Sequence, residues 1–237
     1  PEVSVLAFTD GKAMAPMVSS MDHKRAHDGD TGLNTGGMGT IAPNPCYTEE
    51  VSERCMREIF LPTMQAMNAE GRTFKGCLYF GLMLTKDGPK VIEYNCRFGD
   101  PETQVVLPLL DTDLLTIMRA VEEERLSEID VRFKGGAACC VILASGGYPE
   151  AYEKGKAIDL GGADALADTW VFHSGTAAKD GQLVTSGGRV LGVTATGDTL
   201  KTAIDRAYDA ARRVHFDGMF MRSDIGKRAL EVEGYHG

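Results

Sequence analysis

The segment Lys90–Gln104, KVIEYNCRFGDPETQ, constrains the fold most strongly, because a strand-like run leads directly into a turn rich in polar groups. Side chains of an extended chain alternate between the two faces of a sheet. We therefore expect one face to carry Val91, Glu93 and Asn95, and the other to carry Ile92, Tyr94 and Cys96. Residues 99–102, GDPE, predict a sharp acidic turn after the strand.

Glu93 and Asn95 are oxygen donors on the same face of this strand. Both could reach one hard cation such as Mg²⁺, which prefers carboxylate and amide oxygens and keeps water or phosphate oxygens as its other ligands. Arg97 follows, and its planar guanidinium suits a phosphate or a carboxylate. An ordinary polar strand end is the alternative for Glu93 and Asn95 alone. The string RFGDPETQ that continues from Arg97 favours a metal and anion site.

Bulk composition describes a globular chain of one or two domains, with 237 residues, 43% hydrophobic and 25% charged. The net charge of −9 argues against a nucleic-acid surface and against binding to anionic membranes. We find no apolar run near the roughly 18 residues of a membrane span and no signal peptide. The six cysteines form no C-x-x-C pair, so we expect reduced core residues in a cytoplasmic protein.

Residues 20–45 lack periodicity and are dense in Gly, Asp, Asn and Thr, which predicts a long functional loop. The loop holds His23, Lys24 and Arg25 together and then a glycine-rich run, residues 34–39. Exposed N–H groups of such a turn can cradle an anion, and neighbouring cations add charge. A flexible solvated loop with a chance basic triplet is the alternative.

The remaining pattern predicts an α+β fold. A helix capped by Thr48 should be kinked at Pro62 and end at Gly71. Its apolar face is expected to hold Val51, Cys55, Ile59, Met64 and Met67. A hairpin of 76–85 and 90–95 should precede a helix over 113–126, whose apolar positions are Leu114, Leu115, Met118, Val121 and Leu126.

From Gly135 onward, strands are expected at 135–144, 169–174, 182–186 and 189–196, and a helix over 200–214. We place a boundary near 130, which gives a domain over 1–130 that holds the metal site and a small α+β domain over 131–237. His173, Arg189 and Arg222 are the polar residues of interest in the second domain. A core or surface role for His173, and a carboxylate partner for Arg189, are the ordinary alternatives.

Five segments together resemble glycinamide ribonucleotide synthetase, the phosphoribosylamine–glycine ligase family. They are DHKRAHDGDTGLNTGGMG (22–39), VIEYNCRFGDPETQ (91–104), ASGGYP (144–149), SGGRVLGVTATG (186–197) and RSDIG (222–226). Their order and spacing match the family, and the similarity covers essentially the whole chain. The resemblance implies that 1–130 is the C-terminal half of an ATP-grasp domain, an antiparallel sheet with helices.

The resemblance also implies the chemistry of purine biosynthesis. ATP would phosphorylate glycine, and the amine of 5-phosphoribosylamine would attack the acyl phosphate to give glycinamide ribonucleotide, ADP and phosphate. Mg²⁺ or Mn²⁺ would be held by Glu93 and Asn95, and Arg97 and Asp100 would be catalytic. The substrate-binding residues would be Asp22, Lys24, Arg25, Asn34, Thr35, Gly36, Gly37 and Arg222. How they divide between the ribose phosphate and glycine stays open.

The chain departs from the family pattern at its start. Family members carry an N-terminal α/β domain and a first ATP-grasp half, with a Gly-rich, Lys-containing segment over the triphosphate, and none of these precedes Pro1. We therefore expect this chain to have little ligase activity alone. One alternative is a non-catalytic module that completes a site with a separate N-terminal chain. A ligase for a different amine and acid is another, which RFGDPETQ disfavours.

Overall fold

The computed structural model describes residues 1–232. Contacts divide the chain into two compact units. The N-terminal unit consists of 1–21, 43–99 and 109–135, and the C-terminal unit of 22–42, 100–108 and the residues from 136 onward. One crossing, between 135 and 136, lies near the expected boundary at 130. The division into domains 1–130 and 131–237 stays a prediction. In the structure, residues 22–42 and 100–108 pack with the C-terminal unit.

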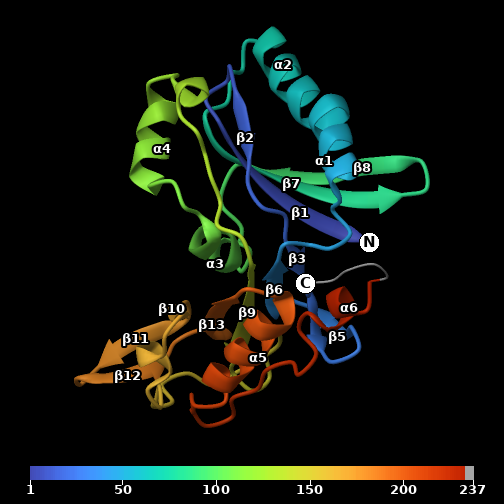
Figure 1. Ribbon diagram of the computed structural model, residues 1–237. Coiled ribbons are helices and arrows are strands. Elements are labelled where there is room, and N and C mark those ends of the chain that lie inside the picture. Colours follow the sequence, from blue (N-terminus) through green and yellow to red (C-terminus); the bar gives the residue numbers. More distant parts are fainter. Residues whose placement is uncertain (233–237) are drawn as a thin grey trace. The chain divides into compact units, whose positions relative to one another are not determined.

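The N-terminal unit is built on a four-stranded antiparallel sheet with the order β2-β1-β7-β8 (Figure 1). Its strands are β1 (Glu2–Thr9), β2 (Met14–Pro16), β7 (Gly76–Thr85) and β8 (Gly88–Asn95). The hairpin of β7 and β8 confirms the pattern of two apolar runs separated by a Gly-containing turn. Gly88, at φ +108°, supplies the backbone conformation that this turn needs.

Helices cover one face of this sheet. α1 (Glu49–Cys55) continues through a π-helical turn (Met56–Phe60) into α2 (Leu61–Ala69). Thr48 caps α1 as expected, since its side chain accepts a hydrogen bond from the Val51 N–H. The kink expected at Pro62 stays a prediction; α2 begins at Leu61 and continues through Pro62, directly after the π turn. Gly71, at φ +68°, follows the helix end.

The apolar core of this unit lies between α1 and the sheet. It contains Val3, Val5, Ala7, Cys55, Ile59, Phe60, Leu78, Phe80 and Leu82. The Phe60 and Phe80 rings lie 4.3 Å apart, centroid to centroid. Met67, expected on the apolar face, is exposed, and α2 has no fully buried residue.

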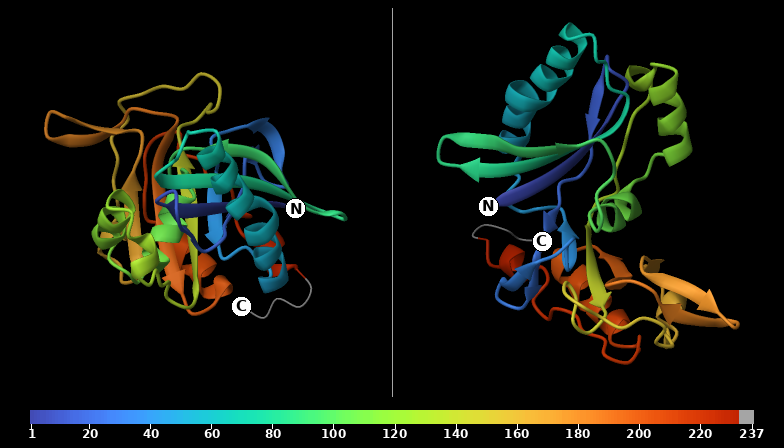
Figure 2. Two further views of the ribbon diagram at one scale, coloured as in Figure 1. Left: turned by 90° about the horizontal axis from the view of Figure 1, so that it is seen from above. Right: turned by 180° about the vertical axis from the view of Figure 1, so that it is seen from behind.

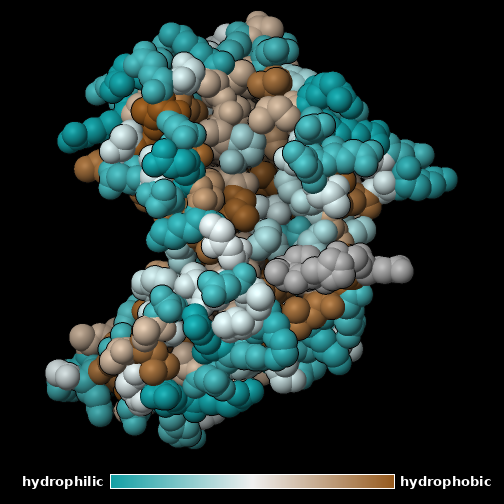
Figure 3. Space-filling view, in the orientation of Figure 1, coloured by the Kyte–Doolittle hydropathy of each residue, from teal (hydrophilic) through white to brown (hydrophobic). Residues whose placement is uncertain are grey.

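α4 (Leu114–Glu122), capped by Asp113, packs near β7 and is followed by a 3₁₀ turn (Leu126–Glu128). Its buried side chains are Ile117, Ala120 and Val121. Among the apolar positions named from the sequence, Val121 and Leu126 are buried, whereas Leu115 and Met118 are exposed. The buried stripe of α4 is narrow, and Figure 3 shows apolar surface over this helix.

The C-terminal unit contains a five-stranded sheet with the order β10-β13-β9-β6-β3. The strands are β3 (Met21–Asp22), β6 (Gly39–Ala42), β9 (Ala137–Ala144), β10 (Thr169–His173) and β13 (Arg189–Gly197). Every residue of β9 is buried, as expected for a central strand covered on both faces. α5 (Leu200–Ala211) packs on β9 and β13 from one side and α3 (Thr103–Val106) from the other (Figures 1 and 2).

Smaller elements complete this unit. Two hairpins are β4 (Arg25–His27) with β5 (Thr31–Asn34), and β11 (Thr176–Lys179) with β12 (Gln182–Thr185). A short helix, α6 (Lys227–Leu230), follows β13 and α5, and 3₁₀ turns occur at Leu107–Leu109 and Ala163–Ala165. Among residues 1–232, no helix is both long and apolar enough to cross a bilayer.

The expectation of a structureless loop over 20–45 is wrong. This segment contains β3, β4, β5 and β6, and β6 is fully buried beside β9. The error has a physical cause. β6 has only four residues, and its partner β9 lies about 100 positions away, so local periodicity carries no signal for the pairing.

Candidate functional site

The strand that carries Glu93 and Asn95 contains a β-bulge. Val91 pairs with Leu82 and Glu93 pairs with Gly81, so Ile92 is the extra residue. The bulge resets the side-chain alternation. Val91 therefore packs against the helix-side core, and the expectation that it shares a face with Glu93 and Asn95 is wrong.

Glu93 and Asn95 lie on the sheet face opposite α1 and contact each other. The Asn95 side-chain Nδ2 donates a hydrogen bond of 3.1 Å to Glu93 Oε1. Gly81 faces Glu93 across the strands, and a Cβ at position 81 would lie 3.0 Å from Glu93 Cγ. Behind them, the hydroxyls of Ser4 and Tyr79 are hydrogen bonded at 2.7 Å. A braced sheet therefore holds both donors.

This pair fits a hard divalent cation that keeps other ligands. A carboxylate and an amide supply two oxygens, and Mg²⁺ commonly binds one or two carboxylates together with water and substrate phosphates. Within residues 1–232, no three His, Cys, Asp or Glu side chains gather as a metal-binding group. An all-protein cage is thus not formed by the described residues, and the metal assignment to Glu93 and Asn95 stays a prediction.

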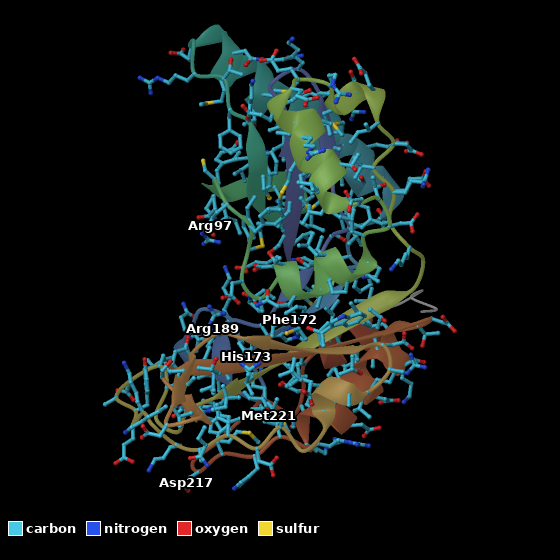
Figure 4. All side chains as sticks on the ribbon, turned by 90° about the vertical axis from the view of Figure 1, so that its left-hand side faces the viewer. Arg97, Phe172, His173, Arg189, Asp217 and Met221 are labelled. Carbon is cyan, nitrogen blue, oxygen red and sulfur yellow. The ribbon has the colours of Figure 1, made fainter. Side chains whose placement is uncertain are left out.

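Arg97 lies just beyond β8 with an exposed side chain (Figure 4). Its Nη1 donates a hydrogen bond of 2.9 Å to the Phe98 carbonyl. The Phe98 ring makes an edge contact with Phe8 of β1, at 6.1 Å between centroids. The backbone that carries Arg97 is therefore anchored, while its guanidinium faces solvent and can contact an anion.

Arg189 connects the acidic turn to the glycine-rich turn of the C-terminal unit. Its Nη2 lies 3.2 Å from Asp100 Oδ2, and its Nη1 donates to the Asp100 and Gly36 carbonyls, both at 3.0 Å. Asp100 also accepts a 2.7 Å hydrogen bond from Gln104 Nε2. The carboxylate partner considered for Arg189 is confirmed. The link to Gly36 was missed, because it joins residues 153 positions apart.

Tyr148 is a residue of this site that the sequence did not single out. Its hydroxyl accepts a 3.0 Å hydrogen bond from the Gly36 N–H. Its ring packs on Gly188, where a Cβ would lie only 2.2 Å from the ring. The Gly-Gly pair before Arg189 thus makes room for the tyrosine that holds the glycine-rich turn. The strings ASGGYP and SGGR were visible in the sequence, but their contact was not.

The glycine-rich turn already uses its N–H groups. Gly36 donates to Tyr148, Gly37 donates to Thr35 Oγ1 at 3.0 Å, and Met38 donates to the His23 carbonyl at 2.8 Å. These N–H groups are thus engaged within the protein, and an anion cradle at this turn stays a prediction. Contact of Asn34, Thr35, Gly36 and Gly37 with substrate stays a prediction. Lys24, Arg25 and Asn34 have exposed side chains.

Asp22 is a half-buried carboxyl at the edge of the same turn. Its Oδ1 accepts hydrogen bonds from the His23 N–H (2.8 Å) and Thr40 Oγ1 (3.3 Å). Burial, and then the nearby carboxylate of Glu102, raise the pKa of Asp22 to about 8. Gly37, at φ +118°, must be glycine here, because a Cβ would lie 2.7 Å from Asp22 Oδ1.

His23 is buried and neutral. Burial, and then the charges of Arg222 and Arg228, lower the pKa of His23 to about 4. Its Nδ1–H donates to the Gly39 carbonyl at 3.1 Å, and its Nε2 accepts from the Gly226 N–H at 3.2 Å. These two partners determine the tautomer.

The Asp22 pKa predicts a pH-dependent stability. A folded pKa of about 8 against 3.8 means that the folded state retains a proton that the unfolded state has lost. Stability from this group is fully present below pH 3.8 and is lost as the pH rises through 8. The lowered pKa of His23 makes the free energy of unfolding rise with pH instead, but only below the unfolded pKa of 6.5. We therefore expect the free energy of unfolding to fall between pH 6.5 and 8, by at most about 2 kcal/mol.

Urea unfolding of Asp22→Asn at both pH values tests this expectation. The variant should lose most of the pH dependence, because the titrating carboxyl is gone. Asp198→Asn, which changes an exposed aspartate of the same unit, is the matched control and should keep the wild-type dependence. An Asp22→Asn variant with an unaltered pH dependence would show that the Asp22 pKa is not raised.

Arg222 and His173 complete the sequence-predicted set. Arg222 is buried, and its guanidinium contacts Asp30 and Asp224. Its contact with substrate stays a prediction. His173 is exposed at the end of β10, where its Nδ1 lies 3.1 Å from Thr176 Oγ1 (Figure 4).

Known proteins share the fold of this chain. The biotin carboxylase domain of the Hydrogenobacter thermophilus 2-oxoglutarate carboxylase, solved with MgADP and bicarbonate, superposes with a TM-score of 0.63. At 14% identity over 93% of this chain and 46% of that one, this likeness concerns the fold alone. The family model described as "Phosphoribosylglycinamide synthetase, ATP-grasp (A) domain" matches residues 1–103. The fold is thus that of an ATP-grasp protein.

The C-domain model of the same family matches residues 138–228. This chain belongs to the phosphoribosylglycinamide synthetase family. It is 46% identical to the phosphoribosylamine–glycine ligase of Vibrio vulnificus, over 98% of this chain and 54% of that protein. The enzyme of the same name from Synechocystis is 50% identical, over 97% and 55%.

A solved structure gives the same result. The phosphoribosylamine–glycine ligase of Thermotoga maritima superposes with a TM-score of 0.86 at 38% identity, over 95% of this chain and 55% of that one. The chain spans about half the length of the curated relatives it matches.

Proposed function

We propose that these residues serve an ATP-dependent ligase that joins glycine to 5-phosphoribosylamine. The observation that carries the proposal is the contacting pair of Glu93 and Asn95 at the end of β8, within the segment matched by the ATP-grasp model. The two proposed substrates are taken from the name of the relatives, phosphoribosylamine–glycine ligase. The six cysteines are all free, which supports a cytoplasmic setting.

The reaction has two steps. A carboxylate oxygen of glycine takes the γ-phosphoryl group of ATP and ADP leaves. The amine then attacks the carbonyl carbon, the C–O bond to phosphate breaks, and the amine loses a proton. Arg97 would bind the glycine carboxylate or the acyl phosphate through its fork. Glu93 and Asn95 would hold Mg²⁺ or Mn²⁺, which neutralises charge on the phosphates during transfer.

The C-terminal unit would bind the phosphorylated amine. Lys24 and Arg25 are exposed cations beside the glycine-rich turn, which Arg189 and Tyr148 hold in place. The net charge of the chain is −9, so local cations must attract an anionic substrate. Asp22 lies at the edge of the glycine-rich turn, and Asp100 of the acidic turn would orient Arg189 for this role.

An omission assay on a full-length protein carrying residues 1–237 tests the proposal. ADP release is measured with ATP, Mg²⁺, glycine and 5-phosphoribosylamine, and then with each left out. We expect release only in the complete mixture, together with glycinamide ribonucleotide identified by mass. Release that does not require glycine, or an amide formed equally well from other amino acids, would refute the assignment.

Arg97→Lys should lower kcat/KM for glycine at least about 10-fold, because an ammonium group cannot reproduce two parallel hydrogen bonds. Arg72→Lys, an exposed arginine of the same unit, is the control and should behave as wild type. Steady-state kinetics with glycine as the varied substrate measures the effect. Equal values for wild type and Arg97→Lys would remove Arg97 from the site.

A further inference from the structure

We infer that residues 222–226, RSDIG, form a latch that holds the β4–β5 hairpin, and that Arg222 is a positioning residue for Lys24, Arg25 and the glycine-rich turn. The hairpin and its two flanking ends carry Lys24, Arg25, Asn34 and Thr35. Arg222 would thus act through the hairpin rather than by touching substrate. The kinetic part of this inference rests on the proposed function, whereas the structural part does not.

Arg222 is the centre of the latch. Its side chain is 1% exposed. Nε and Nη2 donate to the two carboxylate oxygens of Asp224, at 2.7 and 2.9 Å. Nη1 donates to Asp30 Oδ1 at 2.9 Å and to the Arg25 carbonyl at 3.1 Å. All three nitrogens of the guanidinium therefore have partners within the protein, and two of these partners belong to the hairpin.

The hairpin and the latch also exchange backbone contacts. The Gly29 N–H donates to Asp224 Oδ2, and the Ser223 N–H donates to Asp28 Oδ1, both at 2.8 Å. The Ser223 hydroxyl contacts the other oxygen of Asp28. Each segment thus supplies a carboxylate to an N–H group of the other. Such reciprocal contacts define a register between them as well as a distance.

The hairpin is weak without these contacts. Its strands have three and four residues, and Ala26 is the one buried side chain among them. An isolated two-stranded hairpin is marginally stable at best in water. Asp30 adopts φ +54°, an uncommon conformation for a residue other than glycine, and its carboxylate binds both Arg222 and Arg228. The ion pairs therefore hold the turn in a conformation that it would not favour alone.

The latch is itself anchored to the buried part of the unit. The Tyr208 hydroxyl of α5 donates to the Arg222 carbonyl at 2.8 Å and accepts from the Ile225 N–H at 2.9 Å. The Gly226 N–H donates to His23, which precedes the hairpin. Gly226 has φ +80°, and a Cβ there would lie 2.5 Å from Ile204. The latch is thus a rigid reference for the hairpin.

Hydrogen bonds connect the hairpin to Lys24 and to the glycine-rich turn. The Thr35 N–H and Thr35 Oγ1 both donate to the Lys24 carbonyl at 2.8 Å, so the two ends of the hairpin are tied together. Gly37 in turn donates to Thr35 Oγ1. A displacement of the hairpin would therefore move Lys24 and the glycine-rich turn with it.

The charged side chains where the latch contacts the hairpin form ion pairs with one another. Arg222 and Arg228 face Asp30, and Arg222 also faces Asp224. Burial alone would raise the pKa of Asp224, but hydrogen bonds from Arg222 and from the Gly29 N–H outweigh it and lower the pKa to about 2. Asp224 is therefore ionised at neutral pH. Arg222 is engaged by these carboxylates, which is why we assign it to positioning.

The test compares variants of a full-length protein that carries residues 1–237. Arg222→Gln breaks the fork and the contact with Asp30. Asp28→Asn weakens the contact with Ser223 without leaving a buried charge unpaired, so it serves if Arg222→Gln does not fold. Arg206→Gln is the matched control. Arg206 lies on α5, and its half-exposed side chain forms an ion pair with Asp168. Two quantities are measured: amide hydrogen exchange at Gly29 and Ser223, and the KM values for 5-phosphoribosylamine and ATP.

Arg222→Gln should speed exchange at Gly29 and Ser223 about 10-fold or more and raise the KM for 5-phosphoribosylamine about 10-fold. The KM for ATP should change less than about twofold, because a general loss of structure would affect both. Asp28→Asn should show smaller changes of the same kind. Unchanged exchange overturns the latch, and faster exchange with an unchanged KM overturns the positioning role. If the wild type does not use glycine and the amine, the proposed function fails, and the exchange rates still decide the latch.

Discussion

Replacing Glu93 by glutamine in a full-length protein is expected to lower kcat about 100-fold or more and to raise the Mg²⁺ concentration needed for half-maximal rate. The carboxylate is the anionic member of the pair, and glutamine keeps its size but not its charge. A bound metal ion contributes several kcal/mol to transition-state stabilisation in phosphoryl transfer, and each 1.36 kcal/mol corresponds to a factor of ten in rate. Initial rates over a Mg²⁺ titration measure both effects.

Glu53→Gln is the matched control, because Glu53 is an exposed glutamate of the same unit on α1. It should retain the wild-type rate and Mg²⁺ dependence. Circular dichroism should show that Glu93→Gln is folded, since Glu93 is exposed at the strand end. A folded Glu93→Gln variant with wild-type rate and Mg²⁺ dependence would mean that Glu93 does not bind the metal.

Phe80→Ala is expected to lower the free energy of unfolding by about 3–5 kcal/mol. Phe80 is fully buried, and its ring lies 4.3 Å from that of Phe60 and 5.6 Å from that of Tyr94, between centroids. Alanine would lose the burial of a large ring and leave a cavity in the core between α1 and the sheet. Because β7 pairs with β8, the change also weakens the support of Glu93 and Asn95.

Urea unfolding followed by far-ultraviolet circular dichroism measures this loss. Tryptophan fluorescence would report on the other unit, because the single tryptophan, Trp170, lies on β10. Phe172→Ala, at a half-buried position of β10, should lower the free energy of unfolding by less. A loss below about 1 kcal/mol for Phe80→Ala would contradict the packing described for this core.

Local signals predicted much of the N-terminal unit. The cap at Thr48, the glycine after α2 and the Gly-containing turn between β7 and β8 act within a few residues, so the sequence shows them directly. The bulge at Ile92 could not be predicted in this way, because it depends on how β8 pairs with Gly81 and Leu82. The same limit applies to β6, whose partner is distant.

The candidate site shows the same division. The E-x-N pair and Arg97 were visible because strand alternation and side-chain chemistry are local properties. The roles of Arg189 and Tyr148 were not visible, because each contacts a turn more than 100 positions away. The glycine-rich turn was found by composition, but the engagement of its N–H groups is visible only in the folded contacts.

Oxygen transfer from glycine tests the central claim most directly. Glycine labelled with ¹⁸O in both carboxylate oxygens is supplied to the full-length protein with ATP, Mg²⁺ and 5-phosphoribosylamine. If the carboxylate is phosphorylated and the amine then displaces phosphate, one ¹⁸O must appear in the inorganic phosphate of each turnover and the other must stay in the amide. Phosphate that carries no ¹⁸O, released together with ADP, would contradict the proposed ligase.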